Sequence, residues 1–241
     1  NGYPVTTIED GAFADGTSLE SIIIPSSVTT IGSDAFSGCT SLEIVNYLGT
    51  VEQWCTISFE NISANPLSCE AKLYFDGALV TSLKIPSTVT KIKDNAFTGC
   101  TSITSVEISN GATAIGTSAF TYCTALTSVT VPGSVKIIGS AAFGGCESLT
   151  SVVLEEGIEE IQNAAFAETA IEILVIPDGV KTIYPVIVTG CVNLKNIYIP
   201  KTVITISGPL CNAGDGLTAT VYCEISSRPS GWTSGWNDSC S

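Results

Sequence analysis

Cysteine and glutamate are the residues of this sequence whose types and spacing could do chemistry. The 241 residues include ten cysteines but no histidine, so the commonest general base and metal ligand is missing. Ser-His-Asp and Cys-His catalytic arrangements are therefore excluded. The motifs C-x-x-C, G-x-x-x-x-G-K and G-x-G-x-x-G are absent as well. The sequence thus predicts a protein that is not an enzyme, with no catalytic residues and no cofactor.

The densest cluster of charge consists of four glutamates, Glu155, Glu156, Glu159 and Glu160. Carboxylate oxygens are the ligands that calcium prefers, so one interpretation is a calcium site. The other is a bend of the chain whose carboxylates are hydrated. We favour the bend and predict no metal site.

The cysteines fall into two sets. One set shares a C-x-x-L or similar frame, three residues before an apolar strand: Cys39, Cys100, Cys123, Cys146 and Cys191. We interpret it as a column of buried thiols that act as small core residues and weak hydrogen-bond donors to the turn backbone. Disulfides fit this column poorly because its side chains run parallel. The other set is Cys55, Cys69, Cys211, Cys223 and Cys240, in which Cys55 with Cys69, or Cys223 with Cys240, could pair in an exported protein.

A six-residue motif, I-x-x-x-A-F, recurs along the chain and explains the even spacing of these cysteines. Its copies begin 23 residues apart at Ile92, Ile115, Ile138 and Ile161, and two earlier copies begin at Ile8 and Ile31. A fixed period of this length is typical of a coil in which each repeat is one turn, stabilised by the turns on either side.

The unit from Leu126 to Thr150 shows how one turn is built. Leu126, Val129 and Val131 form a short strand with its apolar side chains inward, and Pro132 ends that strand because proline lacks a ladder donor. The Ala-Phe pair then fills the back of the coil. We therefore expect a spine of stacked phenylalanines, Phe97, Phe120, Phe143 and Phe166.

We predict a single domain over residues 1–241, with N-terminal repeats (1–47), an irregular insert (48–80), regular repeats (81–211) and a C-terminal cap (212–241). In the insert, Val51 and Trp54 are predicted to take the places of Val28 and Ile31. Asp76-Gly77 between two apolar runs predicts an antiparallel hairpin. Beyond Cys211 the repeat pattern is expected to stop, and a tail with two tryptophans is expected to cover the last turn.

The unit C-x-x-L-x-x-V-x-V-P-x-x-V-x-x-I-G-x-x-A-F, from Cys123 to Phe143, resembles the BspA-like, treponemal-type leucine-rich repeat. The resemblance implies an α/β, strand-dominated leucine-rich-repeat solenoid with a 23-residue repeat. Its parallel sheet would be concave, with short strands, turns and helical segments on the back. It also implies a cell-surface or secreted protein of host-associated anaerobic bacteria or certain parasitic protists that binds extracellular-matrix proteins or neighbouring cells. The family offers no catalytic motif.

Charge and hydropathy limit the partners. The formal net charge is −14, with no basic stripe to neutralise phosphates, so neither nucleic acid nor an anionic membrane surface is an expected partner. Proline, glycine and serine interrupt every apolar run, so we predict no membrane insertion by this segment. Because Asn1 falls within a repeat, we expect a segment of a longer precursor, either monomeric or part of a longer array.

The outward positions of the strands are the candidate binding surface. Strand alternation places Val153, Ile173, Val175, Asn196 and Tyr198 on the concave face of three adjacent turns, where they would form an exposed, mainly apolar patch. The alternative is plain strand propensity, since β-branched residues suit any strand.

These observations favour an adhesin-like module whose concave face docks a protein ligand, such as a host extracellular-matrix or cell-surface protein. One alternative is a structural stalk within a larger surface protein, without a ligand of its own. Another is a carbohydrate-binding module, for which aromatic residues are few and only Tyr198 is predicted on the concave face.

Overall fold

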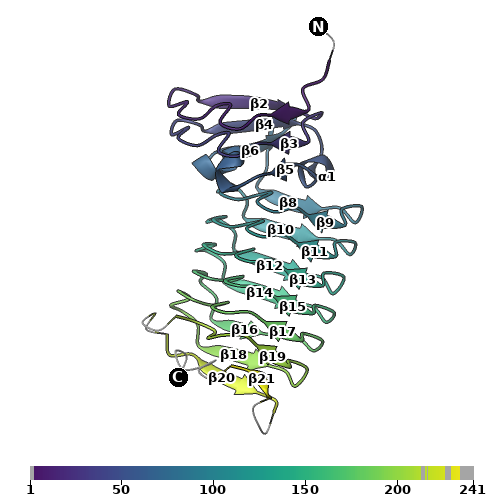
Figure 1. Ribbon diagram of the computed structural model, residues 1–241, viewed down its shortest axis with the longest axis vertical. Helices are drawn as coiled ribbons and strands as arrows, with labels where there is room; N and C mark the ends of the chain where they lie inside the picture. Colours follow the sequence, from purple (N-terminus) through teal and green to yellow (C-terminus); the bar gives the residue numbers. More distant parts are fainter. Residues whose placement is uncertain (1–2, 213–214, 216, 226–228, 234–241) are drawn as a thin grey trace.

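The computed structural model is an elongated rod of stacked turns that runs from the N-terminal to the C-terminal end of the chain (Figure 1). It describes residues 3–212, 215, 217–225 and 229–233. Strands predominate, and almost all of them pair in parallel with a strand of the next turn. This arrangement confirms the predicted strand-dominated, parallel solenoid.

The longer strands follow one another along one side of the rod. They are β2 (Ser21–Pro25), β4 (Ile44–Leu48), β6 (Lys72–Phe75), β8 (Ser82–Ile85), β10 (Ser105–Ile108), β12 (Ser128–Val131), β14 (Ser151–Leu154), β16 (Ile173–Val175), β18 (Asn196–Ile199) and β20 (Thr220–Cys223). Equivalent residues pair directly, as Ser82, Ser105 and Ser128 do. We call the outward surface of these strands the strand face.

Two-residue strands form a second, narrower ladder. They are β1 (Thr7–Ile8), β3 (Thr30–Ile31), β5 (Ser58–Phe59), β9 (Lys91–Ile92), β11 (Ala114–Ile115), β13 (Ile137–Ile138), β15 (Glu160–Ile161), β17 (Thr182–Ile183), β19 (Thr205–Ile206) and β21 (Gly231–Trp232). From β9 to β21 this ladder is continuous. Because the first residue of each I-x-x-x-A-F motif ends one of these strands, the motif marks the same point in every turn.

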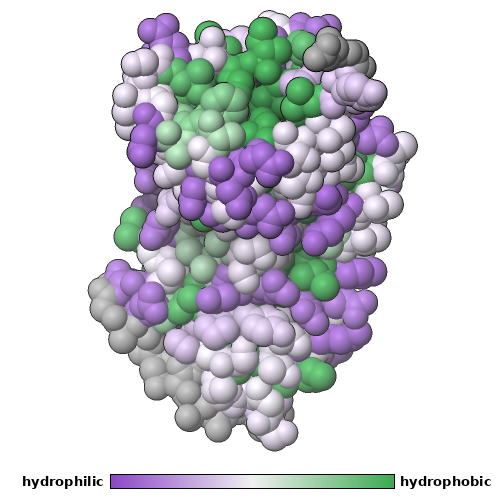
Figure 2. All heavy atoms as spheres, turned by 45° about the horizontal axis from the view of Figure 1, so that its top comes forward, coloured by the Kyte–Doolittle hydropathy of each residue, from purple (hydrophilic) through white to green (hydrophobic). Residues whose placement is uncertain are grey.

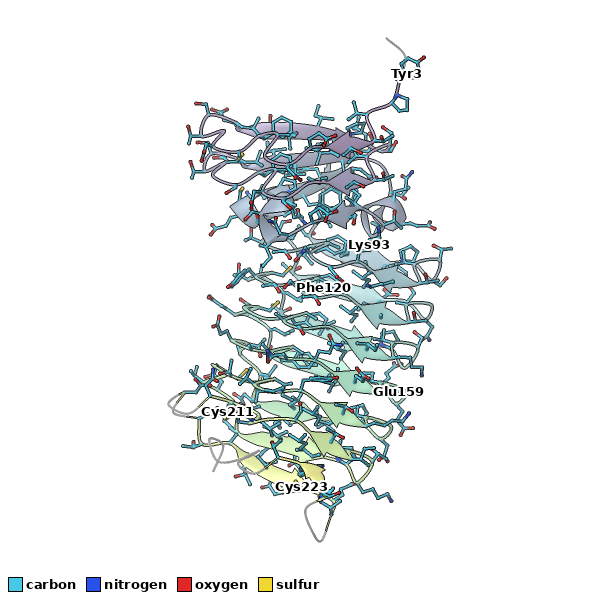
Figure 3. All side chains as sticks on the ribbon, in the orientation of Figure 1. Tyr3, Lys93, Phe120, Glu159, Cys211 and Cys223 are labelled. Carbon is cyan, nitrogen blue, oxygen red and sulfur yellow. The ribbon has the colours of Figure 1, made fainter. Side chains whose placement is uncertain are left out.

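The predicted phenylalanine spine is confirmed. Phe97, Phe120, Phe143 and Phe166 are fully buried, and neighbouring rings stack almost parallel with centroids 5.2, 5.4 and 5.7 Å apart. Phe120 lies inside the coil, whereas Glu159 projects at its edge (Figure 3). Stacked aromatic rings at this separation add to the free energy of simple burial. The spine therefore couples each turn to both of its neighbours.

Two positions in each turn adopt the left-handed backbone conformation. The first position is the residue before the Ala-Phe pair, or before its equivalent Ile187-Val188; it is occupied by Asp34, Asn95, Ser118, Ala141, Ala164 and Val186. The second position lies two residues after the phenylalanine; it is occupied by Asp15, Gly38, Gly99, Tyr122, Gly145 and Glu168. This conformation costs an L-residue roughly 1–2 kcal/mol relative to glycine. The turns are tight enough to impose it even on the β-branched Val186.

The irregular insert departs from the predicted register. The helix α1 (Val51–Trp54) begins with a capping box between Thr50 and Gln53, and it displaces the chain so that Phe59, rather than Trp54, pairs with Ile31. The prediction that Trp54 takes the place of Ile31 was therefore wrong. Two 3₁₀ helices, η1 (Ile62–Ala64) and η2 (Pro66–Cys69), follow. The predicted hairpin is confirmed, since β6 pairs antiparallel with β7 (Ala78–Leu79).

Buried side chains join the insert to the regular array where both ladders are interrupted. Trp54 donates from Nε1 to the carbonyl of Ala96 at 2.7 Å. Asn65 donates from Nδ2 to the carbonyls of Asn95 and Ala96, at 2.7 and 3.0 Å. These bonds give the buried carbonyl of Ala96 its partners and add to the bond that the carbonyl of Asn95 accepts from the backbone N–H of Thr98. A buried carbonyl without a partner is costly.

The coil continues beyond Cys211, contrary to the prediction that its pattern stops there. β20 pairs with β18 and β21 pairs with β19, so both ladders gain a further strand. Trp232 is buried against this turn and donates from Nε1 to the carbonyl of Val203 at 3.2 Å. The second tryptophan of the predicted cap, Trp236, lies outside the described residues.

Removal of a phenylalanine from the spine should destabilise the rod according to the number of its stacking neighbours. We expect Phe120→Ala to lower the free energy of unfolding by about 3–5 kcal/mol, because it opens a cavity between two rings. Phe13 stacks only on Phe36 and is 37% exposed, so Phe13→Ala should cost about half as much. Urea denaturation followed by circular dichroism measures both losses, and equal losses would contradict a spine that couples turns.

Replacing an exposed residue that has the left-handed conformation by glycine should stabilise the protein. Glu168 is exposed with φ of 56°, so we expect Glu168→Gly to raise the free energy of unfolding by about 0.5–1 kcal/mol. Glu147 is a matched control, because it is an exposed turn glutamate outside the left-handed positions. Glu147→Gly should lower the same free energy, and a gain in both variants would refute the conformational explanation.

Candidate functional site

The predicted binding residues all lie on the strand face at the C-terminal end of the rod. Val153 on β14 is 50% exposed, Ile173 and Val175 on β16 are 49% and 54% exposed, and Tyr198 on β18 is 40% exposed. Asn196, also on β18, is half-buried. The outward orientation expected from strand alternation is thus confirmed for the four larger side chains, while their role in binding stays a prediction.

The strand register brings most of these residues together. Val175 pairs with Tyr198, and Ile173 pairs with Asn196, across β16 and β18. Val153 lies on β14, the next strand along the rod, but the hydrogen-bonded ladder is interrupted between β14 and β16. The reason is a one-residue deletion in this repeat, where Ile161 and Ile183 are 22 residues apart instead of 23.

Tyr222 completes the surface and was missed by the sequence reasoning. It pairs with Tyr198 across β18 and β20, is 48% exposed, and its ring stacks on that of Tyr198 with centroids 4.8 Å apart and planes 9° apart. The available signal was Val221-Tyr222-Cys223, which repeats the apolar-Tyr-apolar pattern of Ile197-Tyr198-Ile199 after 24 residues. We call Val153, Ile173, Val175, Tyr198 and Tyr222 the apolar strand-face patch.

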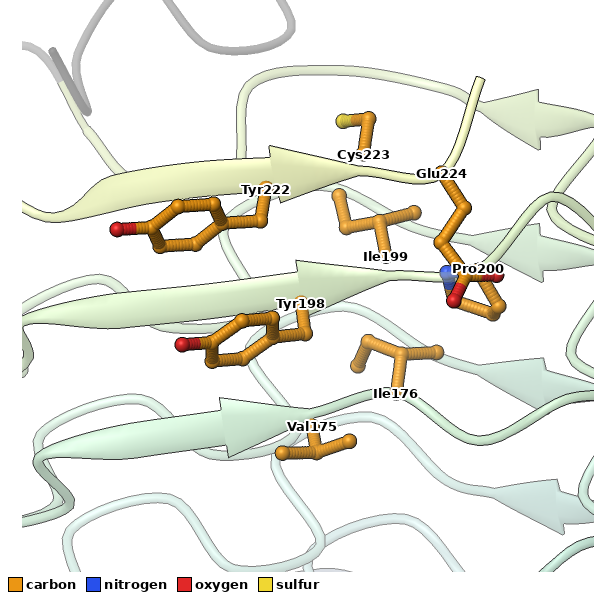
Figure 4. Close-up of a pocket in the computed structure, with 8 residues that line it drawn as sticks. All are labelled: Val175, Ile176, Tyr198, Ile199, Pro200, Tyr222, Cys223 and Glu224. Carbon is orange, nitrogen blue, oxygen red and sulfur yellow. The ribbon is translucent and has the colours of Figure 1, made fainter.

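A hollow of about 390 Å³ lies beside the two tyrosines (Figure 4). Val175 and the paired rings of Tyr198 and Tyr222 form one part of its lining, and Pro200 and Glu224 close the ends of the strands. The lining is mainly aliphatic and aromatic, with Glu224 as its charged group. This composition suits contact with an apolar or aromatic group that carries a polar edge.

A second group of exposed apolar side chains occupies the N-terminal end of the rod, where Figure 2 shows hydrophobic residues gathered. On the strand face it includes Ile23, at 64% exposure, Ile44 and Leu48. Ile23 was not among the predicted binding residues. Val5 and Phe13 of the first turn are exposed in the same part of the chain.

The thiol column is confirmed as a set of buried thiols, and four of its five members donate to the turn backbone; the fifth, Cys100, lies 3.6 Å from the hydroxyl of Ser102 instead. Four thiols each donate to the carbonyl of the phenylalanine in the preceding turn: Cys39 to Phe13, Cys123 to Phe97, Cys146 to Phe120 and Cys191 to Phe166, at Sγ to O distances of 3.0–3.2 Å. Cys69 donates in the same way to Phe36 at 3.3 Å, so its exclusion from the column was wrong. Cys69 is the last residue of η2, which places its thiol where the cysteine of a C-x-x-L frame lies in other turns.

The candidate disulfides are not formed in the described part of the chain. Cys55, Cys69 and Cys223 are free thiols, so neither proposed pair exists, although Cys240 itself lies outside the described residues. Cys211 is disulfide-bonded. Burial raises the pKa of Cys55 and Cys146 to about 12 and that of Cys100 to about 11, so these thiols stay protonated at neutral pH. A buried thiol of this kind is a poor nucleophile.

The glutamates of the acidic cluster are engaged separately. Glu159 forms an ion pair with Lys181 at 2.6 Å, and the hydrogen bond from Lys181 lowers the pKa of Glu159. Glu155 accepts a hydrogen bond from the backbone of Gly133 at 3.1 Å. Within the described ranges, no group of three or more Asp, Glu or Cys residues is placed to hold a metal ion.

No helix among the described residues is long and apolar enough to cross a bilayer. The longest of these helices, α1 and η2, have four residues each.

Comparison with known proteins identifies the repeat. The model of the "BspA type Leucine rich repeat region" matches six copies over residues 6–74 and 70–195. No curated protein matches the sequence.

Several solved structures resemble the chain. A leucine rich cell surface protein from Faecalibacterium prausnitzii is 21% identical over 99% of this chain and 86% of its own, with a TM-score of 0.33. The T. pallidum Leucine Rich Repeat protein is 24% identical over 90% and 71%, with a TM-score of 0.36. The pneumococcal vaccine antigen PcpA is 17% identical over 94% and 67%, with a TM-score of 0.53. Of these three structures, the pneumococcal antigen has a TM-score above 0.5, and at 17% identity its likeness concerns the fold alone.

Burial should protect the column thiols from alkylation. With iodoacetamide at pH 8.5 we expect the half-buried Cys69 and Cys223 to react before Cys123 and Cys146. The raised pKa of Cys123 and Cys146 keeps these thiols protonated, and their burial keeps the reagent away from the sulfur. Peptide mass spectrometry measures the order, and labelling in urea should abolish it. Early labelling of Cys146 in the folded protein would contradict the buried column.

Proposed function

Because the chain belongs to the BspA type leucine-rich repeat family, we propose that it is a non-enzymatic binding module that docks a partner protein on its apolar strand-face patch. The observation that carries the proposal is the stacked pair of Tyr198 and Tyr222 beside the exposed Val175. A contiguous exposed apolar patch on a protein of this charge is a common mark of an interaction site.

The stacked tyrosines supply what a binding hot spot requires. Tyrosine offers a large contact area with few rotatable bonds, and it is enriched among residues that contribute most to binding. Each ring restricts the other, since their planes lie 9° apart at a centroid separation of 4.8 Å. Less side-chain entropy is then lost when a partner binds.

Polar groups border the patch, as they do in protein interfaces. Asn196 is half-buried on β18, and the ion pair between Lys195 and Glu172, at 2.7 Å, lies one residue before the strand face on two turns. Such an exposed pair contributes little free energy, but it sets the charge that a partner must match. An apolar centre with a polar rim is the usual anatomy of an interface.

The finer function that we propose is adhesion. The partner would be a host extracellular-matrix or cell-surface protein, and the module would be displayed on the cell surface or secreted, as the resemblance to BspA-like proteins implies. The net charge of −14 favours ligands with a basic or neutral docking surface over acidic ones.

Carbohydrate binding is the second candidate, and the pairing of Tyr222 with Tyr198 favours it more than the sequence alone did. Two aromatic rings beside a hollow that contains Glu224 offer both a stacking surface and a hydrogen-bond acceptor for hydroxyl groups. The stalk remains the alternative in which the surface has no ligand.

Charge placed in the patch should abolish capture of the partner. We expect Val175→Lys with Tyr198→Lys to weaken binding to immobilised fibronectin, laminin or collagen by about 30-fold or more, the loss typical of a hot spot worth about 2 kcal/mol. Surface plasmon resonance on purified matrix proteins, with a glycan array in parallel, measures the effect.

The matched control is Ser128→Lys with Thr130→Lys, which adds the same charge at equivalent outward positions of β12. This variant should bind like the unmodified protein, and both should keep its circular dichroism spectrum. Equal binding by the patch variant would refute the protein-docking role. Selective binding on the glycan array would favour the carbohydrate module, and no binding to either set would favour the stalk.

A further inference from the structure

A second hollow, of about 410 Å³, lies on the turn side of the rod, where the irregular insert meets the regular array. The insert contributes Ser68 and Glu70 to its lining, and three successive turns contribute Thr101, Tyr122, Thr124 and Glu147. We call it the junction hollow. Its residues belong to neither the strand face nor the apolar patch, and its volume is within the range of about 300–1,000 Å³ that is usual for small-molecule sites.

The wall on the insert side is held in place by close backbone packing. A side chain at Gly99 would approach the carbonyl of Leu67 to 2.4 Å, so only glycine lets η2 lie this close to the array. Thr101 donates from Oγ1 to the carbonyl of Glu70 at 3.3 Å, and Glu70 ends η2 in the left-handed conformation. The carboxylate of Glu70 is therefore attached to a fixed segment.

Tyr122 forms the opposite wall in a position where most turns have glycine or an acidic residue. It is left-handed, with φ of 59°, and 52% exposed. Its ring rests against Gly145 of the next turn, where a side chain would come within 2.4 Å of Cδ1. Part of the ring is thus packed on the backbone, and the rest is open to a ligand.

The charge of the hollow is negative and unbalanced. Glu70 and Glu147 are both exposed, and neither takes part in the ion pairs of the described residues. No lysine contributes to the lining, whose other polar side chains are serine and threonine hydroxyls and the phenol of Tyr122. Hydroxyl and carboxylate oxygens accept hydrogen bonds from an ammonium group, which has three donors and no acceptor.

We propose that the junction hollow binds a primary alkylammonium group, such as the end of a lysine side chain presented by a partner. Carboxylates would offset its charge, and the ring of Tyr122 would contact the cation or its methylene groups, since an aromatic face attracts cations. The negative field of the whole chain favours the same ligand. The site is separate from the apolar patch, so either assignment can fail alone.

The test is a titration of the whole chain with Nα-acetyl-lysine methylamide, followed by amide chemical shifts in NMR. The matched neutral ligand is Nα,Nε-diacetyl-lysine methylamide, which has nearly the same shape but no ammonium group. We expect shifts at residues of the junction hollow with the charged ligand, weaker binding at higher salt, and at least tenfold weaker binding of the neutral one.

Variants identify the groups responsible. Glu70→Gln with Glu147→Gln should weaken binding at least fivefold, whereas Glu20→Gln with Glu43→Gln, which changes the net charge equally at exposed sites elsewhere, should leave it within twofold. Tyr122→Phe should keep binding because it keeps the ring, and Tyr122→Leu should weaken it. Val175→Lys with Tyr198→Lys should have no effect here.

Equal binding of the two lysine derivatives, or binding unaffected by Glu70→Gln with Glu147→Gln, would overturn the proposal. A comparison with n-butylammonium distinguishes two sources of the ammonium group, a lysine side chain of a protein and a free amine. Tighter binding of the lysine derivative would assign the site to a protein side chain, and equal binding would assign it to a free amine.

Discussion

Completion of each turn by its neighbour is the constraint on which the rest of this structure depends. A thiol in one turn donates to the phenylalanine carbonyl of the turn before, as Cys146 does to Phe120, and the phenylalanine rings stack in the same direction. Both contacts require equivalent residues to superpose, and the thiol contact persists where the spacing changes, since Cys191 still donates to Phe166 across the 22-residue repeat. Where one residue is lost between Ile161 and Ile183, the longer-strand ladder is interrupted between β14 and β16. The core thus specifies the period, and the outward residues remain free to vary.

That freedom explains where the apolar strand-face patch arises. The strand face carries serine, threonine and paired charges in the middle of the rod, as in Ser128, Thr130 and the ion pair of Lys84 with Glu107. Toward the C-terminal end the same positions become Val175, Tyr198 and Tyr222, and in the core there Val188 and Cys211 take the place of the spine phenylalanine. The junction hollow has another origin, because an insert of different shape leaves space against three regular turns.

The sequence was sufficient for every feature that follows the period. The phenylalanine spine, the strand alternation and the outward position of Tyr198 all come from spacing that one turn shares with the next. Trp54 was misplaced because α1 absorbs four residues before the narrow ladder resumes at Phe59. Tyr222 was missed because its strand lies beyond the last recognisable motif, and Cys69 because a 3₁₀ helix delivers its thiol. The junction hollow combines separate segments, and no local pattern encodes their approach.

Both hydrogen-bonded ladders are interrupted at the junction between the insert and the array. Across it, the buried side chains of Trp54 and Asn65 supply bonds that backbone groups supply elsewhere. In stacked-turn proteins, loss of structure spreads from one turn to the next according to the coupling between them. Fraying that starts at the exposed first turn therefore meets a different kind of coupling at this boundary. The array beyond it can persist as a separate cooperative unit, with the apolar strand-face patch intact.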